Sequence, residues 1–383
     1  MPIGPILIDT HCMLAIIFKN LSIRERKIFW IVGIIFALAA LLKITLLFYS
    51  NTELRPVHGG ILREGVVGQP VFINPLLAVS DIDLDLTHLI FSPLSQFINT
   101  IKMNDEGTIW ELDLKDNIMW DDKMPIDSDD VLFTISAIQD PSYHVPLALY
   151  SSWQNVSVER ISARKIRFTL KLPYAFFEDT IKNLRIVPRH IFENIPPENI
   201  RFSERNLKPV GNGPFAFSQI QKLSNGLVRE YDLRSNEYFV GAKPFLEGVK
   251  FSFFIAESEV INAFNHRTID ALLISNPSLS DIILSHNIFI YRFPQYYALF
   301  LSQLLQTDLK DDTIRQALNL LVDKQKIVRD VFQMQAQVVD GPIAEPILGD
   351  DNISIARSSF DPAAANALLE KMAGTLMRMV IDL

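Results

Sequence analysis

The longest run of hydrophobic residues lies close to the N-terminus. Residues 28–49 form 22 consecutive positions with a single charge, Lys43. A helix of that length rises roughly 33 Å, which exceeds the hydrocarbon thickness of about 30 Å. Lys43 lies near the far end of the run, from where its side chain can reach the headgroups. The pattern therefore predicts a helix that crosses a lipid bilayer.

Basic residues before this run predict its orientation. Arg24, Arg26 and Lys27 precede it, and positive charge beside an apolar helix favours the cytoplasmic side. We therefore expect residues 1–27 inside the cell, residues 28–49 as a single pass through the plasma membrane, and the remainder outside, in the periplasm or at the cell surface. A cleaved signal peptide is the alternative, although the run exceeds the roughly 7 to 15 apolar residues typical of one.

Beyond residue 58 the hydrophobic pattern changes to short segments. Alternating apolar and polar positions predict strands at residues 61–66, 110–114, 166–172 and 249–253. Apolar spacing near 3.6 residues and capping residues predict helices after Asp127, at residues 257–265, from Asp312, after Asp323 and from Asp361-Pro362 to Gly374. These segments follow one another in irregular order. The outer part is therefore expected to be a mixed α/β protein.

Composition and charge exclude several classes of protein. Hydrophobic residues make up 49% of the 383 positions, which is too many for a disordered or collagen-like chain. The net charge is −8, and no stretch gathers the Lys and Arg that a nucleic-acid groove requires. Cys12 is the single cysteine, so an intramolecular disulfide and a cysteine metal cluster are excluded. Nucleic acid is not an expected partner.

Motifs for catalysis and cofactor binding are missing from the sequence. It contains no HExxH, GxSxG, GxxxxGK[ST] or GxGxxG phrase, and its seven histidines form no pair at helical spacing. The acidic cluster at residues 121–130 lacks the glycine and the final glutamate of a calcium loop, so a turn and a helix cap explain it better. Asp81, Asp83 and Asp85 fit a helix start better than a strand with three carboxylates on one face. We expect no enzyme activity, no metal and no cofactor, which favours binding over catalysis.

Two further features are interpreted structurally. The segment Gly211-Asn212-Gly213-Pro214 is read as a tight turn, because Pro214 lacks the N–H that a phosphate-binding loop would use. Four aromatic residues are candidates for lining a pocket, although such residues lie more often in a core. They are Trp120, Trp153, Tyr296 and Tyr297.

Five phrases, in order along the chain, resemble a known family. They are LKDNIMWDDKMPIDSDDVLFT at residues 114–134, GNGPF at 211–215, NEYFVGAKP at 236–244, RQALNLLVDKQKIV at 315–328 and GPI at 341–343. They are similar to signature phrases of the family 5 extracellular solute-binding proteins of ABC importers, which include oligopeptide- and dipeptide-binding proteins. Lys123 stands where the family phrase has glycine. The resemblance covers about residues 59–374.

This resemblance implies a fold and a division into domains. The expected fold is α/β, two-lobed and periplasmic-binding-protein-like (type II, family 5), closing on a solute by a hinge motion. It implies a linker at residues 50–58, a first lobe at 59–297 with an inserted subdomain at about 76–200, and a partial second lobe at 298–383. Relatives continue beyond this point, so the resemblance also implies an incomplete second lobe, in a truncated gene product or in a deliberately short variant.

The resemblance also implies a function and site residues. The ligand-binding positions would be Val79, Ser80, Asp81, Ile274, Ser275, Asn276, Tyr296 and Tyr297. The implied protein is the membrane-anchored solute-binding component of an ABC importer, with a peptide, nickel chelate or sugar as solute. Its partners would be the importer's permease subunits and, through residues 28–49, the lipid bilayer. A family member without a transport function, acting as an inert fragment, adhesin or sensor domain, is the alternative.

Overall fold

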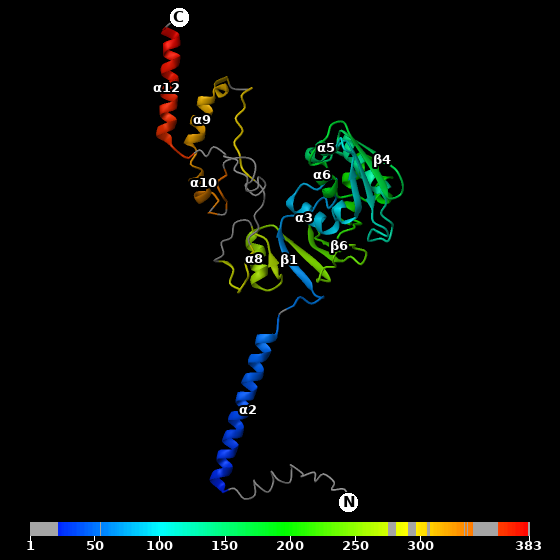
Figure 1. The fold of residues 1–383 in the computed structure, drawn as a ribbon, viewed down its shortest axis with the longest axis vertical. Coiled ribbons are helices and arrows are strands. Elements are labelled where there is room, and N and C mark those ends of the chain that lie inside the picture. Colours follow the sequence, from blue (N-terminus) through cyan, green and yellow to red (C-terminus); the bar gives the residue numbers. More distant parts are fainter. Residues whose placement is uncertain are drawn as a thin grey trace, which may run out of the picture. The chain divides into compact units, whose positions relative to one another are not determined.

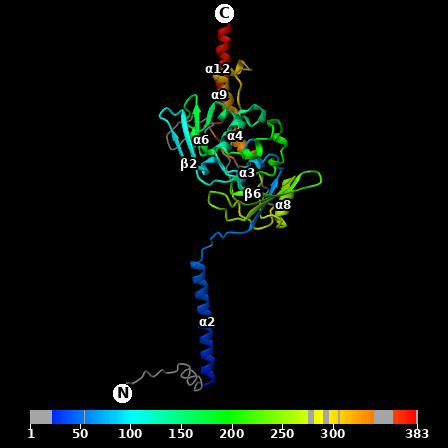
Figure 2. The ribbon, with the colours of Figure 1, turned by 90° about the vertical axis from the view of Figure 1, so that its right-hand side faces the viewer.

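The structure is a computed structural model that describes residues 22–53, 55–274, 281–289, 296–304, 307–332, 334, 336–339 and 359–381 of the chain. The chain divides into two compact units, residues 1–285 and residues 286–383. Figures 1 and 2 show the helices and strands of both units in two views. Each unit is described by itself.

The N-terminal apolar segment forms a single helix, α2 (Ile23–Asn51). The Ser22 hydroxyl accepts a hydrogen bond from the Glu25 backbone N–H, and the Glu25 carboxylate accepts one from the Ser22 N–H at 2.7 Å. This reciprocal capping defines where the helix begins. Large apolar side chains are exposed along its whole length, and the stretch Ile23–Ser50 is long and apolar enough to cross a bilayer. The expected N-terminal apolar helix is present.

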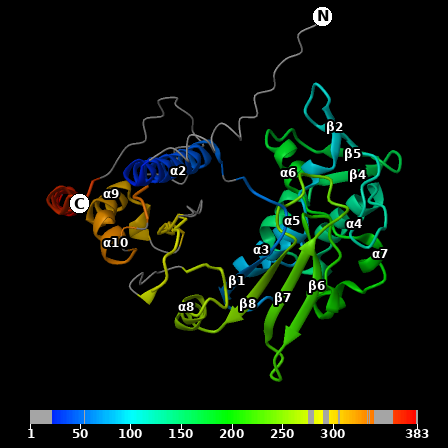
Figure 3. The same ribbon diagram turned by 90° about the horizontal axis from the view of Figure 1, so that it is seen from below.

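The first unit contains a five-stranded sheet in the order β6-β7-β8-β1-β9. Its strands are β1 (Ile61–Val67), β6 (Phe215–Lys222), β7 (Val228–Ser235), β8 (Gly248–Phe254) and β9 (Ala271–Leu272). β1 runs parallel to β8 and β9, whereas β6, β7 and β8 are antiparallel (Figure 3). Helix α3 (Asp81–Ile90) follows β1, and helix α8 (Glu257–Asn265) follows β8.

A second, antiparallel sheet lies within the segment between α3 and β6. Its order is β2-β3-β5-β4, from β2 (Ile98–Met103), β3 (Ile109–Leu114), β4 (Val156–Arg160) and β5 (Lys165–Leu170). The same segment holds α4 (Ser128–Gln139), α5 (Leu147–Trp153), α6 (Phe177–Asn183) and α7 (Arg189–Phe192). Short 3₁₀ turns cover Leu94–Gln96, Pro141–Tyr143, Pro197–Phe202 and Glu204–Asn206. The segment thus forms a subdomain inserted between strands of the first sheet.

One apolar core joins the two sheets of the first unit. Trp120 and Trp153 are almost completely buried in it. The ring of Trp153 packs edge-on against Phe177, with centroids 5.8 Å apart. Burial on this scale is worth about 2 kcal/mol or more for each large side chain. The expectation that these tryptophans belong to the core is confirmed.

The segment Gly211–Pro214 contacts the end of α3. The backbone N–H groups of Asn212 and Gly213 donate to the Ile90 carbonyl at 3.0 and 2.7 Å. A Cβ atom added at Gly211 would lie 2.2 Å from the same oxygen. Glycine is therefore required here because two backbone segments approach closely, which agrees with a structural reading of this segment.

The second unit contains helices α9 (Asp312–Leu321), α10 (Lys324–Asp330) and α12 (Pro362–Ile381), with a 3₁₀ turn at Thr307–Lys310. Asp311, and not the predicted Asp312, caps α9 by accepting from the Thr313 N–H at 2.7 Å. Two adjacent aspartates could each cap the helix by sequence. In the structure Asp311 has the extended backbone of an N-cap, and Asp312 is the first helical residue. Helix α12 also continues through Gly374, where the sequence predicted its end. Ala317 of α9 and Ala365 of α12 are buried.

Candidate functional site

The order of strands in the five-stranded sheet identifies one edge as a candidate ligand site. Because β1 runs parallel to β8 and β9, the carboxyl ends of all three strands lie at the same edge. Neighbouring residues of β1 point to opposite faces. Glu64 lies near Asp85 of α3, whereas a Cβ at Gly65 would lie 2.5 Å from Val260 of α8. The chain therefore continues from β1 to α3 on one face of the sheet and from β8 to α8 on the other. Open α/β sheets bind ligands where the connections diverge in this way.

We call this edge the carboxyl-end edge and define it by the residues that follow the three strands: Val79, Ser80 and Asp81 before α3, Ile255 after β8, and Leu273 and Ile274 after β9. Three of them are exposed apolar side chains, with exposed fractions of 68% for Val79, 77% for Ile255 and 47% for Leu273. Asp81 is also exposed. Apolar residues together with a few polar or charged groups are one feature of small-molecule sites.

The loop between β1 and α3 is held in place by buried hydrogen bonds. The Asp83 carboxylate, which is only 3% exposed, accepts from the backbone N–H groups of Val71 and Phe72 at 2.7 and 3.0 Å. Ser80 is the N-cap of α3 and accepts from the Asp83 N–H at 3.1 Å. Ser80 and Asp83 thus have structural roles, which agrees with reading this segment as a helix start. They fix the backbone that presents Val79 and Asp81.

Three carboxylates, those of Glu64, Asp81 and Asp85, lie near one another between β1 and α3. Burial raises the pKa of Asp85, and the charge of Asp81 raises it further. Burial likewise raises the pKa of Glu64, with Asp85 as the second cause. Neighbouring carboxylates therefore repel one another in this region, and an incoming amine would relieve that repulsion. Within the described ranges, no group of three or more His, Cys, Asp or Glu residues could hold a metal ion.

The remaining predicted ligand positions fall in different places. Ile274 lies two residues beyond β9, half-buried at the carboxyl-end edge. Ser275 and Asn276 lie outside the described residues. Tyr296 and Tyr297 belong to the second unit and are 47% and 79% exposed. The structure thus brings Val79, Ser80, Asp81 and Ile274 to one edge of the first unit.

Sequence reasoning missed Glu64, Ile255 and Leu273. Each lies in or directly after a strand of the sheet. An apolar residue immediately after a strand is the signal that points to Ile255 and Leu273, but only once the parallel order of the strands is known.

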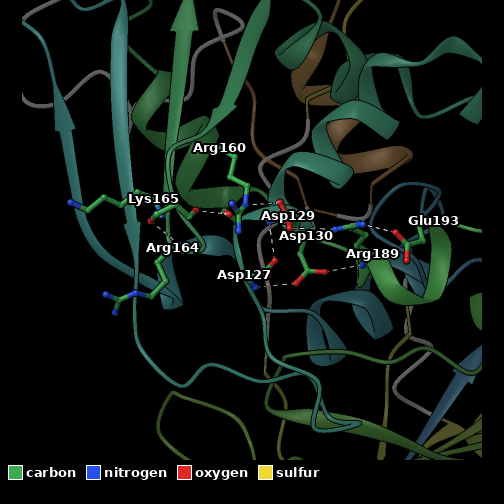
Figure 4. Close-up of polar contacts among 10 residues, drawn as sticks. Asp127, Asp129, Asp130, Arg160, Arg164, Lys165, Arg189 and Glu193 are labelled. Atoms are coloured by element: carbon green, nitrogen blue, oxygen red, sulfur yellow. Dashed lines mark hydrogen bonds and ion pairs between the residues drawn. The ribbon is translucent and has the colours of Figure 1, made fainter.

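The acidic cluster at residues 121–130 has a structural role, which Figure 4 shows for Asp127, Asp129 and Asp130. Asp127 caps α4, and Asp129 forms ion pairs with Arg160 at 3.0 Å and Arg189 at 3.3 Å. The Asp130 carboxylate accepts hydrogen bonds from the backbone N–H groups of Arg189 and Asp127 and from the Trp120 indole N–H, at 2.8 to 3.2 Å. Burial nevertheless raises the pKa of Asp130 to about 6, because desolvation outweighs these bonds. The prediction of a turn and a helix cap is confirmed.

The order and direction of the strands place the chain among open α/β proteins, a class in which ligands are commonly bound at the ends of parallel strands. Comparison with known families gives a narrower assignment. The family profile described as "Bacterial extracellular solute-binding proteins, family 5 Middle" matches residues 73–376. The chain belongs to this family of extracellular solute-binding proteins.

Relatives by sequence include three curated bacterial proteins. The chain is 24% identical to the oligopeptide-binding protein AppA of Bacillus subtilis, over 74% of this chain and 54% of that protein. It is 28% identical to the nickel-binding periplasmic protein of Escherichia coli, over 71% and 52%. It is 23% identical to the dipeptide-binding protein of the same organism, over 90% and 69%. The chain thus spans about half to two thirds of the length of these relatives.

Solved structures agree with this assignment. The chain resembles the ABC transporter substrate-binding protein CtaP of Listeria monocytogenes with a TM-score of 0.69 and 27% identity, covering 82% of this chain and 65% of that one. It resembles NikZ of Campylobacter jejuni in complex with Ni(L-His) with a TM-score of 0.64 and 26% identity, covering 82% and 63%. The first of these structures is named as a substrate-binding protein of an ABC transporter, and the second contains a bound nickel–histidine complex.

Proposed function

We propose that the chain is an extracytoplasmic solute-binding protein that binds a peptide, without chemistry, for uptake by an ABC importer. The observation that carries this proposal is the carboxyl-end edge, where Val79, Ile255 and Leu273 are exposed and Asp81 begins α3, at the point where the chain leaves β1 and β8 towards opposite faces. The names of the relatives support the solute class, because the AppA and dipeptide-binding proteins are named for peptides.

In this proposal, Asp81 pairs with a positively charged amine of the solute, and the apolar residues contact its side chains. Asp81 is exposed and already adds to the repulsion on Asp85, so a cation would be favoured at this position. Ile274 contributes apolar contact beside Leu273. Ser275, Asn276, Tyr296 and Tyr297 remain proposed ligand positions on the strength of the family resemblance. The importer's permease subunits remain the proposed protein partners.

We further propose that α2 anchors the protein in the plasma membrane as a single pass. The support is its length, its exposed apolar surface and the basic residues before it. The net charge of residues 51–383 is −11, so this part is not attracted to anionic lipid and the helix alone would hold it there.

Isothermal titration calorimetry tests the proposal on the full chain in detergent micelles. A pool of di- to pentapeptides with free amino termini should give saturable heat at one peptide per chain. A second titration uses nickel with L-histidine. Heat in that titration alone would indicate that the solute is a nickel chelate and not a peptide. No heat in either arm would contradict binding by this chain and would favour a family member without a transport function.

The variant Asp81→Asn tests the role of the carboxylate. Loss of one partly exposed charge pair should weaken peptide binding about fivefold, or about 1 kcal/mol. Asp105→Asn, which changes an exposed carboxylate in the turn between β2 and β3, is the matched control and should leave affinity unchanged. Acetylated peptides should show no difference between the wild type and Asp81→Asn. Equal affinity of both variants for free peptides would exclude Asp81 from the site.

A further inference from the structure

The outer edge of β4 has free backbone hydrogen-bonding groups. In the antiparallel sheet, the Leu170 backbone N–H donates to the Thr108 carbonyl, and the Ile161 backbone N–H donates to the Lys165 carbonyl. These two bonds define the register on both sides of β5. Ser157 and Glu159 therefore bond to β5, while the backbones of Val156, Val158 and Arg160 face outward.

One outward group of β4 already has a partner. The Gln139 side-chain amide of α4 donates to the carbonyls of Trp153 and Val156, both at 2.7 Å. By this register, the backbone N–H and C=O groups of Val158 and Arg160 do not bond to β5. Among the described residues, no turn or loop backbone hydrogen bond reaches them either. An extended chain placed beside β4 would complete these bonds at the spacing of a strand.

A groove lies beside this free edge. It has a volume of about 620 Å³ and is lined by residues of α4, β4 and β5, including Leu132, Gln139, Val158 and Thr169, and by Lys171, which directly follows β5. This volume falls within the range of ligand sites, which is roughly 300–1,000 Å³. Lys171 is the single charged residue in the lining, and no carboxylate contributes to it. The groove therefore suits a neutral or acidic occupant.

The charged residues of β4 do not cover the edge. Charged side chains on an edge strand normally prevent pairing with other chains. Here Arg160 is held by Asp129 of α4 at 3.0 Å, and Glu159 approaches Arg167 of β5 at 3.9 Å. Both side chains are thus directed to neighbours within the subdomain.

We infer that the β4 edge binds an extended apolar segment that carries a carboxylate and belongs to a partner protein. This segment adds a fifth strand to the order β2-β3-β5-β4. Backbone groups of Val158 and Arg160 supply pairing, α4 supplies apolar contact through Leu132, and Lys171 meets a carboxylate of the segment. The groove opens to solvent, which suits a segment whose ends continue into a larger protein. This site is separate from the carboxyl-end edge and does not depend on solute binding.

A defined peptide tests this inference on the full chain in detergent micelles. The probe is a fluorescein-labelled six-residue peptide of alternating Thr and Val with a free carboxylate. Val158→Pro removes an outward N–H without removing a bond to β5, a position at which edge strands accept proline. Met103→Pro makes the same change at the outward edge of β2 and is the matched control, since Lys102 and Thr100 are the β2 residues that bond to β3.

Fluorescence anisotropy should show saturable binding to the wild type and to Met103→Pro, and about tenfold weaker binding to Val158→Pro. Hydrogen exchange on the wild type is the second measurement and does not depend on how the variants fold. The probe should slow exchange at the Val158 and Arg160 amides about tenfold, and a probe N-methylated at alternate residues should not. Equal binding to Val158→Pro, unchanged exchange at Val158, or no binding at about 1 mM probe would overturn the inference.

Discussion

Lys123 occupies a backbone conformation that ordinarily belongs to glycine. Its φ angle is 73°, in a tight turn where Lys123 donates its N–H to the Trp120 carbonyl at 3.0 Å. A side chain in this region costs roughly 1 kcal/mol compared with glycine. The similar phrase in family 5 proteins has glycine at this position, so the strain agrees with the resemblance.

Lys123→Gly should therefore stabilise the first unit by about 1 kcal/mol. Urea unfolding followed by tryptophan fluorescence would measure the change, because Trp120 lies in the same turn and is fully buried. Lys115→Gly is the control, since Lys115 has no positive φ, and it should not stabilise. A loss of stability in Lys123→Gly would contradict the account of this turn.

Two carboxyl groups, the half-buried Asp121 and the buried Asp130, make the free energy of unfolding depend on pH. Burial raises the pKa of both Asp121 and Asp130 to about 6, from the usual 3.8. Each group then binds a proton more tightly in the folded chain, so the free energy of unfolding rises as pH falls from above 6 towards 4. Asp130 should contribute on the order of 1–3 kcal/mol. His88 acts in the opposite sense below pH 6.5, because burial lowers its pKa.

The melting temperature of the full chain should therefore be higher at pH 5 than at pH 7.5. Asp121→Asn keeps an oxygen that can accept a hydrogen bond but removes the titration, so it should reduce this difference. Differential scanning fluorimetry across this pH range would measure both effects. A melting temperature that falls steadily from pH 7.5 to pH 5 would show that desolvation does not dominate at these two aspartates.

At the scale of elements, the end of α3 depends on its contact with Gly211. Gly211→Ala would place a methyl group against the backbone oxygen of Ile90, which cannot move aside as a side chain can. We expect a loss of about 3 kcal/mol, measured by urea unfolding. Gly226→Asn is the control, because nothing lies within 4 Å of its position and asparagine accepts its φ of 86°. Equal stability of Gly211→Ala and the wild type would contradict this packing.

Local pattern predicted the elements whose ends are marked by single residues. Helix α8 has the predicted bounds, and Asp127 caps α4 as expected. Strand β2 was not predicted, because its apolar residues Ile98, Ile101 and Met103 do not alternate strictly with polar ones. Helix α12 passes Gly374 because glycine costs a helix only about 1 kcal/mol, which the flanking helix formers can offset.

The candidate site was less accessible to sequence reasoning than the elements. Val79, Ser80, Asp81 and Ile274 were reached by family resemblance alone. The proximity of Glu64 to Asp85 depends on the packing of α3 against β1. The placement of Ile255 and Leu273 at the same end of the sheet follows from β8, β1 and β9 running parallel. That strand order is set by packing between distant parts of the chain, and no local hydrophobic pattern encodes it.

For the whole molecule, the first question is whether α2 is retained as an anchor. The intact chain of 43.6 kDa should remain in the membrane pellet after carbonate extraction, and protease added outside spheroplasts should degrade it. Its mass by mass spectrometry distinguishes an anchor from a signal peptide. A soluble product that begins after about residue 50 would show that the helix is removed.

Native mass spectrometry tests the central claim most directly. The full chain, released gently from detergent after incubation with a pool of di- to pentapeptides, should carry one peptide per molecule, and Asp81→Asn should carry less of it at the same concentration. A chain that retains no peptide, or retains it equally in the wild type and Asp81→Asn, would contradict solute binding at the carboxyl-end edge.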